Sequence, residues 1–240
     1  MKKNILTNII TLSIMITLSI NGILFAKVEF SGDVTGVTTY VWRGVKQYNG
    51  PALQGTASFA TGPLLFGMWV SSVNFGYGID DANLLADQSE IETDPFIEIS
   101  LPTGPVSGAI GAVIYSYDML TYFNANADYE YEIYGSFSIG AIAATAFFVP
   151  KQSSTDNNLN SSDYWIEFSG NHSLYGADLS ATLGYGTYSS KFLGEKDAVS
   201  YIQFSASRSA SETLSVNWNY LIGLSHPVDD LFWLGCSIEF

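Results

Sequence analysis

LFWLGCSIEF (231–240) carries an apolar side chain at every second position, up to the last residue of the sequence. The apolar row consists of Phe232, Leu234, Cys236, Ile238 and Phe240. Because successive side chains of a β-strand point to opposite faces, this spacing predicts a strand with one apolar face. Such a face contacts either a second sheet, as in a soluble sandwich, or lipid, as in a membrane barrel.

The same alternation recurs in long runs elsewhere in the chain. It extends over residues 28–42, 90–101, 128–139, 175–188 and 213–224. Most of these runs reach about 10–14 residues. Globular strands average about 5–6 residues, whereas a tilted membrane strand needs about 9–11. The length of the runs therefore favours a wall in contact with lipid over the core of a secreted β-sandwich, which is the alternative reading.

The links between the runs alternate in length. We expect about twelve strands, near 28–42, 52–60, 64–74, 90–101, 105–117, 129–138, 140–149, 163–170, 174–188, 198–208, 213–224 and 230–240. Short links fall at 61–63, 102–105, around Gly140, at 170–173 and at 209–212. Longer polar links fall at 43–51, 75–89, 118–127, 150–162, 190–197 and 225–230. Short turns at one end and long loops at the other are typical of outer-membrane barrels with an even strand number. The sequence thus predicts an all-β fold, a transmembrane antiparallel up-and-down β-barrel.

The first 26 residues read as a secretory signal peptide. Two lysines precede the uncharged apolar run IITLSIMITLSI (9–20), and Ala26 offers a small residue for cleavage before Lys27. A retained N-terminal anchor helix is the alternative. We expect residues 27–240 to form the barrel in the bacterial outer membrane, with both ends of the barrel chain on the short-turn side.

The charge balance excludes some classes of partner. Two of the nine Lys and Arg residues lie in the signal segment, which leaves seven bases against 23 acids. Such an acidic chain lacks the basic footprint that nucleic acid requires. Cys236 is the one cysteine of the sequence, so no internal disulfide is possible. The partners we expect are outer-membrane lipid and lipopolysaccharide, the barrel-assembly machinery and small polar solutes.

The last residues also predict how the barrel closes. A barrel must leave no open edge in hydrocarbon, so the final strand is expected to pair with the first. Phe240, with Ile238 two residues before it, resembles the C-terminal signal that the outer-membrane assembly machinery recognises.

Several stretches resemble a known family. They are YVWRGVKQYNGPALQG (40–55), GMWVSSV (67–73), EIETD (90–94), YSY (115–117) and YEIYGSFSIG (131–140). Through them the chain resembles the TorF-type family of proteobacterial outer-membrane porins, over most of residues 28–150. The resemblance implies a small outer-membrane barrel that acts as a channel, and it supplies no substrate.

Carboxylates fall on the row opposite the apolar one, where they would line a lumen. They are Glu90, Glu92, Asp94, Glu98, Glu130, Glu132, Glu167 and Asp178. Rings of carboxylates favour cations in a pore. With seven bases in the barrel chain, most acids stay unpaired by a base, which favours a wet lumen. The alternative is a largely filled barrel in which acids pair with the few bases, or with Tyr and Ser.

Arg43 opens the first predicted outer loop, beside Gly44. It could lie at the pore mouth opposite the acids, or anchor the loop to the wall through a carboxylate or carbonyl. For most of Trp42, Trp69, Trp218 and Trp233 we expect a place in the aromatic girdle at the membrane interface.

We predict a channel for passive diffusion of small polar solutes, cationic or neutral. The alternative function is a non-conducting barrel that serves as adhesin or structural element of the envelope. An enzyme is not expected, because His172 and His226 are predicted to lie in an inner turn and an outer loop. An acyl hydrolase using Ser225 and His226 is disfavoured since neighbouring side chains point apart. We expect no cofactor and no metal; the acidic loop 76–90 matches no calcium-loop spacing.

Overall fold

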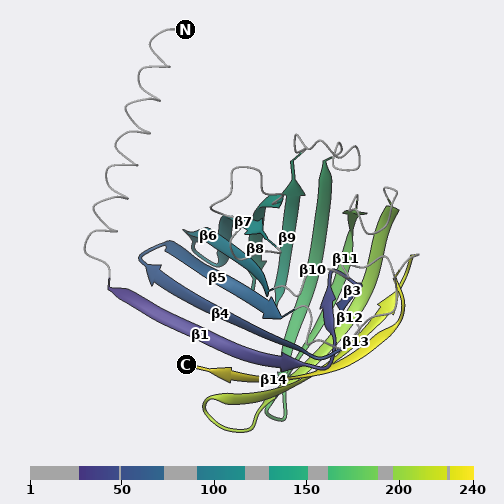
Figure 1. Cartoon of the computed structure of the whole chain (residues 1–240). Helices are drawn as coiled ribbons and strands as arrows, with labels where there is room; N and C mark the ends of the chain where they lie inside the picture. Colours follow the sequence, from purple (N-terminus) through teal and green to yellow (C-terminus); the bar gives the residue numbers. More distant parts are fainter. Residues whose placement is uncertain are drawn as a thin grey trace, which may run out of the picture.

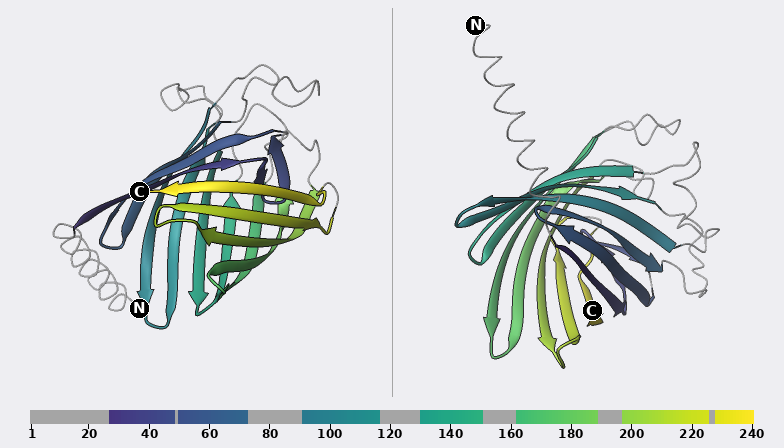
Figure 2. Two further views of the ribbon diagram at one scale, coloured as in Figure 1. Left: turned by 90° about the horizontal axis from the view of Figure 1, so that it is seen from below. Right: turned by 90° about the vertical axis from the view of Figure 1, so that its left-hand side faces the viewer.

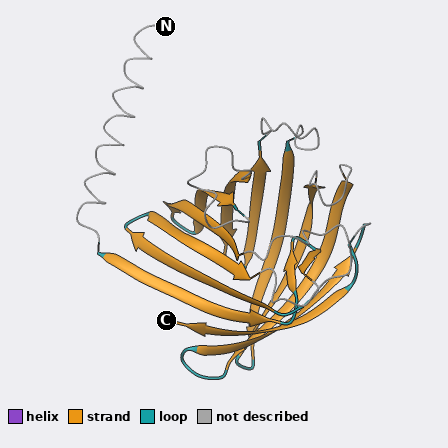
Figure 3. Cartoon of the chain, viewed as in Figure 1, coloured by secondary structure: helices purple, strands orange, loops and turns teal. Residues whose placement is uncertain are grey.

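The computed structural model describes residues 27–48, 50–72, 91–116, 130–150, 162–188, 197–225 and 228–240. Twelve strands of this part form one closed antiparallel barrel, and two more form a separate hairpin (Figure 1). Figure 3 shows that strands make up nearly all of the described chain. Within the described ranges, no helix has the length and apolar character needed to cross a membrane. The predicted signal peptide, 1–26, lies outside them.

The barrel strands follow one another in sequence around the wall (Figures 1 and 2). They are β1 (Val28–Val37), β4 (Ala52–Thr61), β5 (Leu64–Ser72), β6 (Ile91–Thr103), β7 (Val106–Tyr115), β8 (Glu130–Ile139), β9 (Ile142–Val149), β10 (Asp163–Leu174), β11 (Ala177–Tyr188), β12 (Asp197–Ser209), β13 (Leu214–Gly223) and β14 (Leu231–Glu239). The strand number and antiparallel topology agree with the sequence prediction.

The first and last barrel strands join, as predicted. β1 pairs with β4 on one side and with β14 on the other, from Asp33 opposite Glu239 to Val37 opposite Gly235. Beyond this ladder, Gly32 and Phe240 exchange both backbone hydrogen bonds, each 3.0 Å from nitrogen to oxygen. Every strand of the wall therefore has two neighbours, and the sheet has no open edge.

The two faces of the wall differ in character. On β6, Ile97 and Ile99 are 48% and 49% exposed on one face, whereas Glu92 and Asp94 on the other are 4% and 5% exposed. The exposed apolar row recurs on the other barrel strands, and Cys236 belongs to it. An apolar belt of this extent around a closed barrel is the surface that acyl chains cover. A second packed sheet, which the sandwich reading requires, does not cover it.

The segment after β1 differs from the prediction. β1 ends at Val37, and β2 (Tyr40–Trp42) pairs with β3 (Val45–Tyr48) in a hairpin of its own. The prediction of a strand over 28–42 followed by an outer loop over 43–51 is therefore wrong. The physical reason is that the apolar–polar alternation of 28–42 does not end with the wall strand β1. It continues into the hairpin, whose strands lie against the inner face of the wall.

One short turn also lies elsewhere than predicted. β10 continues through 170–173, and the turn falls at Tyr175 and Gly176, whose φ angles are +51° and +74°. Two successive positive φ values are those of a type I′ hairpin turn. His172 consequently lies within β10 and not in an inner turn. The polar run that suggested a turn there includes residues of a lumen wall.

Candidate functional site

The β2–β3 hairpin stands inside the barrel. In the ring of hydrogen-bonded strands, β9 and β10 lie opposite the β1–β4 junction from which the hairpin starts. Arg43, at the hairpin tip, lies with its Cζ 4.3 Å from the ring centre of Phe147 on β9 and 5.7 Å from that of Trp165 on β10. The hairpin therefore extends from the β1–β4 side of the barrel to the opposite side, formed by β9 and β10.

The turn of this hairpin depends on Arg43 and Gly44. Their φ angles are +49° and +81°, the two positive values that a two-residue type I′ turn requires. A Cβ atom on Gly44 would lie 2.6 Å from Cδ1 of Tyr201. Glycine is therefore needed there both for its backbone conformation and for the close approach to β12.

A bidentate ion pair fixes the tip to the far wall. Nη1 and Nη2 of Arg43 donate to the two carboxylate oxygens of Glu132 on β8, at 2.7 and 2.8 Å. The hydroxyl of Tyr115 donates to Oε1 of the same carboxylate at 2.9 Å. The side chains of Arg43 and Glu132 are 9% and 1% exposed. Arg43 thus lies inside the barrel, near the end that carries the long links, since Tyr115 is the last residue of β7 and Glu132 the third of β8. The ion pair with Glu132 is the second role predicted for Arg43, in which it anchors its segment to the wall through a carboxylate.

An apolar cluster packs against the hairpin inside the barrel. It consists of Trp165, Tyr201, Leu221 and Trp233 on the inner face, with Val41 and Val45 of the hairpin against them. Tyr40 and Trp42 of the hairpin make ring contacts with Trp69 and Tyr115 of the wall. The expectation of an interfacial girdle is therefore wrong for Trp42, Trp69 and Trp233. Trp218, 41% exposed, lies on the outer row.

The lumen acids have hydrogen-bond partners in the wall. Tyr134 donates to Glu98 at 2.9 Å. Glu167 accepts from Nε1 of Trp165 at 2.9 Å and from the hydroxyl of Tyr201 at 3.0 Å. These contacts belong to the filled-barrel alternative, in which Tyr side chains partner the acids.

The remaining predicted lumen acids are distributed as follows. Glu92 and Asp94 lie buried in the inner wall of β6, and Asp178 on β11 accepts from Ser173. Glu90 lies outside the described residues, and the side chain of Glu130 is not described. His226 also lies outside them. The structure brings Arg43 and Glu132 together, and it separates Asp178 from the acids of β6.

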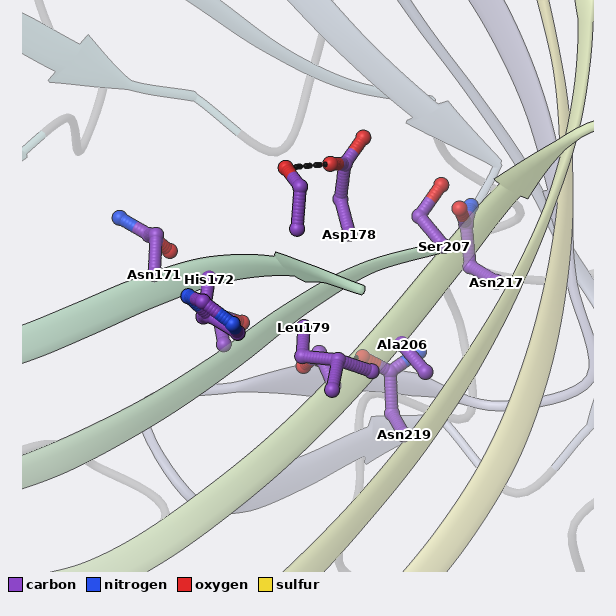
Figure 4. Close-up of a pocket in the computed structure, with 11 residues that line it drawn as sticks. Asn171, His172, Asp178, Leu179, Ala206, Ser207, Asn217 and Asn219 are labelled. Atoms are coloured by element: carbon purple, nitrogen blue, oxygen red, sulfur yellow. Dashed lines mark hydrogen bonds between the residues drawn. The ribbon is translucent and has the colours of Figure 1, made fainter. Parts of the chain in front are cut away.

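A polar hollow opens on the inner face near the short turns (Figure 4). Its volume is about 370 Å³. Hydroxyl and amide side chains dominate its lining, with one carboxylate: Asn171, Ser173, Asp178, Ser205, Asn217 and Asn219. The lumen thus has an apolar, hairpin-filled region and a separate polar region.

No protein-family model and no curated protein matches the chain. An outer membrane channel from Pseudomonas putida F1 has a similar structure, at 11% identity and a TM-score of 0.53, over 88% of this chain and 94% of that one. A membrane protein crystallised in meso is similar at 9% identity and a TM-score of 0.55, over 88% and 83%. These similarities show the fold. Together with the apolar belt, they confirm the predicted outer-membrane β-barrel and its location.

Proposed function

We propose that the protein is an outer-membrane channel through which small polar solutes, cationic or neutral, diffuse passively. One observation carries the proposal: in the described barrel strands the one Lys or Arg side chain is Arg208, which lies on the outer row beside Val216. The inner face carries Glu98, Glu167 and Asp178 among its acids. Such a wall favours cations over anions in its interior.

The β2–β3 hairpin sets the aperture in this proposal. It supplies Arg43, whose charge Glu132 neutralises, and it narrows the region that the apolar cluster lines. The polar hollow beside Asp178 and Asn217 remains open to water. Solutes of small cross-section are therefore the ones that such a channel would pass. The resemblance to the TorF-type porins implies the same activity, and membership of that family stays a prediction.

The proposal is tested with the refolded protein in planar bilayers under a KCl gradient. We expect discrete conductance steps and a reversal potential on the cation-selective side. Asp178→Asn should lower the cation preference, whereas Cys236→Ser, on the lipid-facing row, should leave it unchanged. A reversal potential on the anion-selective side would overturn the proposed selectivity.

A second candidate function is a non-conducting barrel, an adhesin or structural element of the envelope. The observation that favours it is the hairpin itself, which crosses the lumen and leaves Glu132 1% exposed at its tip. In that case the folded wild-type protein inserts into the bilayer without conductance steps. Conductance of the wild-type protein would exclude this candidate.

A further inference from the structure

Two carboxylates lie side by side in the inner wall without a described ion-pair partner. Glu92 and Asp94 share the inner face of β6 and are 4% and 5% exposed. Lys27 pairs with Glu29 and Arg43 with Glu132, and neither of these ion pairs includes Glu92 or Asp94. Two adjacent buried negative charges repel each other and are costly unless a positive charge or a proton joins them.

A buried hydroxyl without a hydrogen-bond partner among the described residues lies beside Glu92. Ser71 on β5 is the direct register partner of Glu92, and both side chains point inward. Side chains opposed in this way have Cβ atoms about 4.5–5.5 Å apart. Ser71 is 0% exposed, and its Oγ has no hydrogen-bond partner among the described residues. Leaving a buried polar atom of this kind unpaired costs about 1–3 kcal/mol, so a bound ion or a water molecule beside it would stabilise the fold.

The surroundings orient the carboxylates but leave them acceptor capacity. The hydroxyl of Tyr40, at the root of the β2–β3 hairpin, donates a hydrogen bond to Glu92. The backbone N–H of Ser116 donates to Oδ1 of Asp94 over 3.4 Å. An ionised carboxylate has about four lone-pair sites, so each acid retains free positions.

We propose that Ser71, Glu92 and Asp94 form a binding site for a hard divalent cation of the calcium class, set in the inner wall beside the hairpin root. Calcium takes six to eight oxygen ligands, and carboxylates bind it through one or both oxygens. No group of three or more His, Cys, Asp or Glu side chains that could hold a metal occurs in the described ranges. The protein therefore supplies two carboxylates and a hydroxyl, and water completes the coordination. The site does not depend on conduction, since a closed barrel would hold it equally.

Terbium luminescence tests the site directly. Tb³⁺ replaces Ca²⁺ in oxygen sites. The rings of Tyr40 and Trp69, whose centres are 5.6 Å apart, lie next to the proposed cation site. Trp69 is also the register partner of Asp94. We expect the refolded barrel, excited through Trp, to give saturable Tb³⁺ luminescence that added Ca²⁺ displaces.

Matched variants separate this site from general binding to an acidic protein. Glu92→Gln and Asp94→Asn should each weaken Tb³⁺ binding by about tenfold or more, because each removes a charge and an oxygen ligand. Glu98→Gln, the next inward acid of β6, which accepts from Tyr134 at 2.9 Å, should keep wild-type affinity. Circular dichroism and the heat-dependent electrophoretic mobility of folded barrels establish that each variant folds.

Three results would overturn the proposal. One is wild-type affinity in both carboxylate variants. Another is an equal loss of affinity in Glu98→Gln. The third is a folded wild-type barrel without saturable luminescence at neutral pH, in which case the two carboxylates share a proton. If neither carboxylate variant folds, Ser71→Ala decides: a several-fold loss of affinity supports the site, and unchanged affinity rejects it.

Discussion

Arg43 and Glu132, 89 residues apart in the sequence, form a bidentate ion pair inside the barrel. One residue comes from a hairpin that leaves the wall after β1, and the other from β8 on the far side. The pair therefore joins two parts of the barrel that no backbone hydrogen bond connects. Its burial makes it sensitive to loss of either partner, since a lone buried charge is strongly destabilising.

Substitution of Arg43 should release the hairpin. Arg43→Ala leaves the carboxylate of Glu132 buried without its cation, which costs about 3–5 kcal/mol when one partner of a buried pair is removed. We expect a lower free energy of unfolding in urea and, if the protein conducts, a larger single-channel conductance.

Arg43→Lys is the matched variant. It keeps the charge but loses the bidentate geometry, so the decrease in unfolding free energy and the increase in conductance should both be smaller than in Arg43→Ala. Equal stability and equal conductance of the wild type and Arg43→Ala would show that the ion pair does not hold the hairpin.

Gly44 and Gly104 offer a test of the close approach between the hairpin and β12. Both have positive φ angles, +81° and +77°, but a Cβ on Gly44 would lie 2.6 Å from Cδ1 of Tyr201, whereas one on Gly104 would meet nothing within 4 Å. Gly104→Ala should therefore cost only the backbone strain, about 1–2 kcal/mol. Gly44→Ala should cost more. Urea unfolding of both variants measures the difference, and equal losses would contradict a packed hairpin.

The barrel could be predicted because its signal repeats with a period of two. Exposed residues such as Ile97 and Ile99 mark the lipid face wherever they occur, so strand positions follow from the sequence alone. The turn at Tyr175 and Gly176 was predicted a few residues too early, at 170–173. The polar residues of 170–173 line the lumen, and their composition resembles that of a turn.

The inward course of the hairpin left a weaker signal. Trp165, Tyr201 and Trp233 lie on the polar row, where a water-filled lumen has no need of large apolar side chains. Their position indicates that an apolar element fills part of the interior. Which element does so depends on a contact between distant strands, and neither composition nor periodicity encodes that contact. The pairing of Arg43 with Glu132 is of the same kind.

The lipid belt is tested by two adjacent residues of β10. Phe168 is 54% exposed on the outer row, and Ser169 is the register partner of Ala143 on the inner face. Phe168→Arg should cost about 2–4 kcal/mol if the residue lies near the bilayer midplane. Ser169→Arg places the same charge in the lumen and should cost less. The free energies of unfolding from lipid vesicles check this, and the reverse order would mean that the two faces are assigned wrongly.

Phe240 should matter more for assembly in the cell than for stability of the finished barrel. Its ring lies over Gly32, where a Cβ would be 2.8 Å from Cε2 of that ring, but the residue is 64% exposed and its backbone bonds to Gly32 do not need the side chain. Phe240→Ala should therefore refold in detergent with little loss of stability, whereas the amount of folded barrel in the outer membrane falls several-fold. Phe232→Ala is the matched control, because Phe232 lies on the same row of β14 at 61% exposure. Equal amounts of both variants in the outer membrane would show that the terminal position carries no assembly signal, since the two substitutions remove the same ring from the same face.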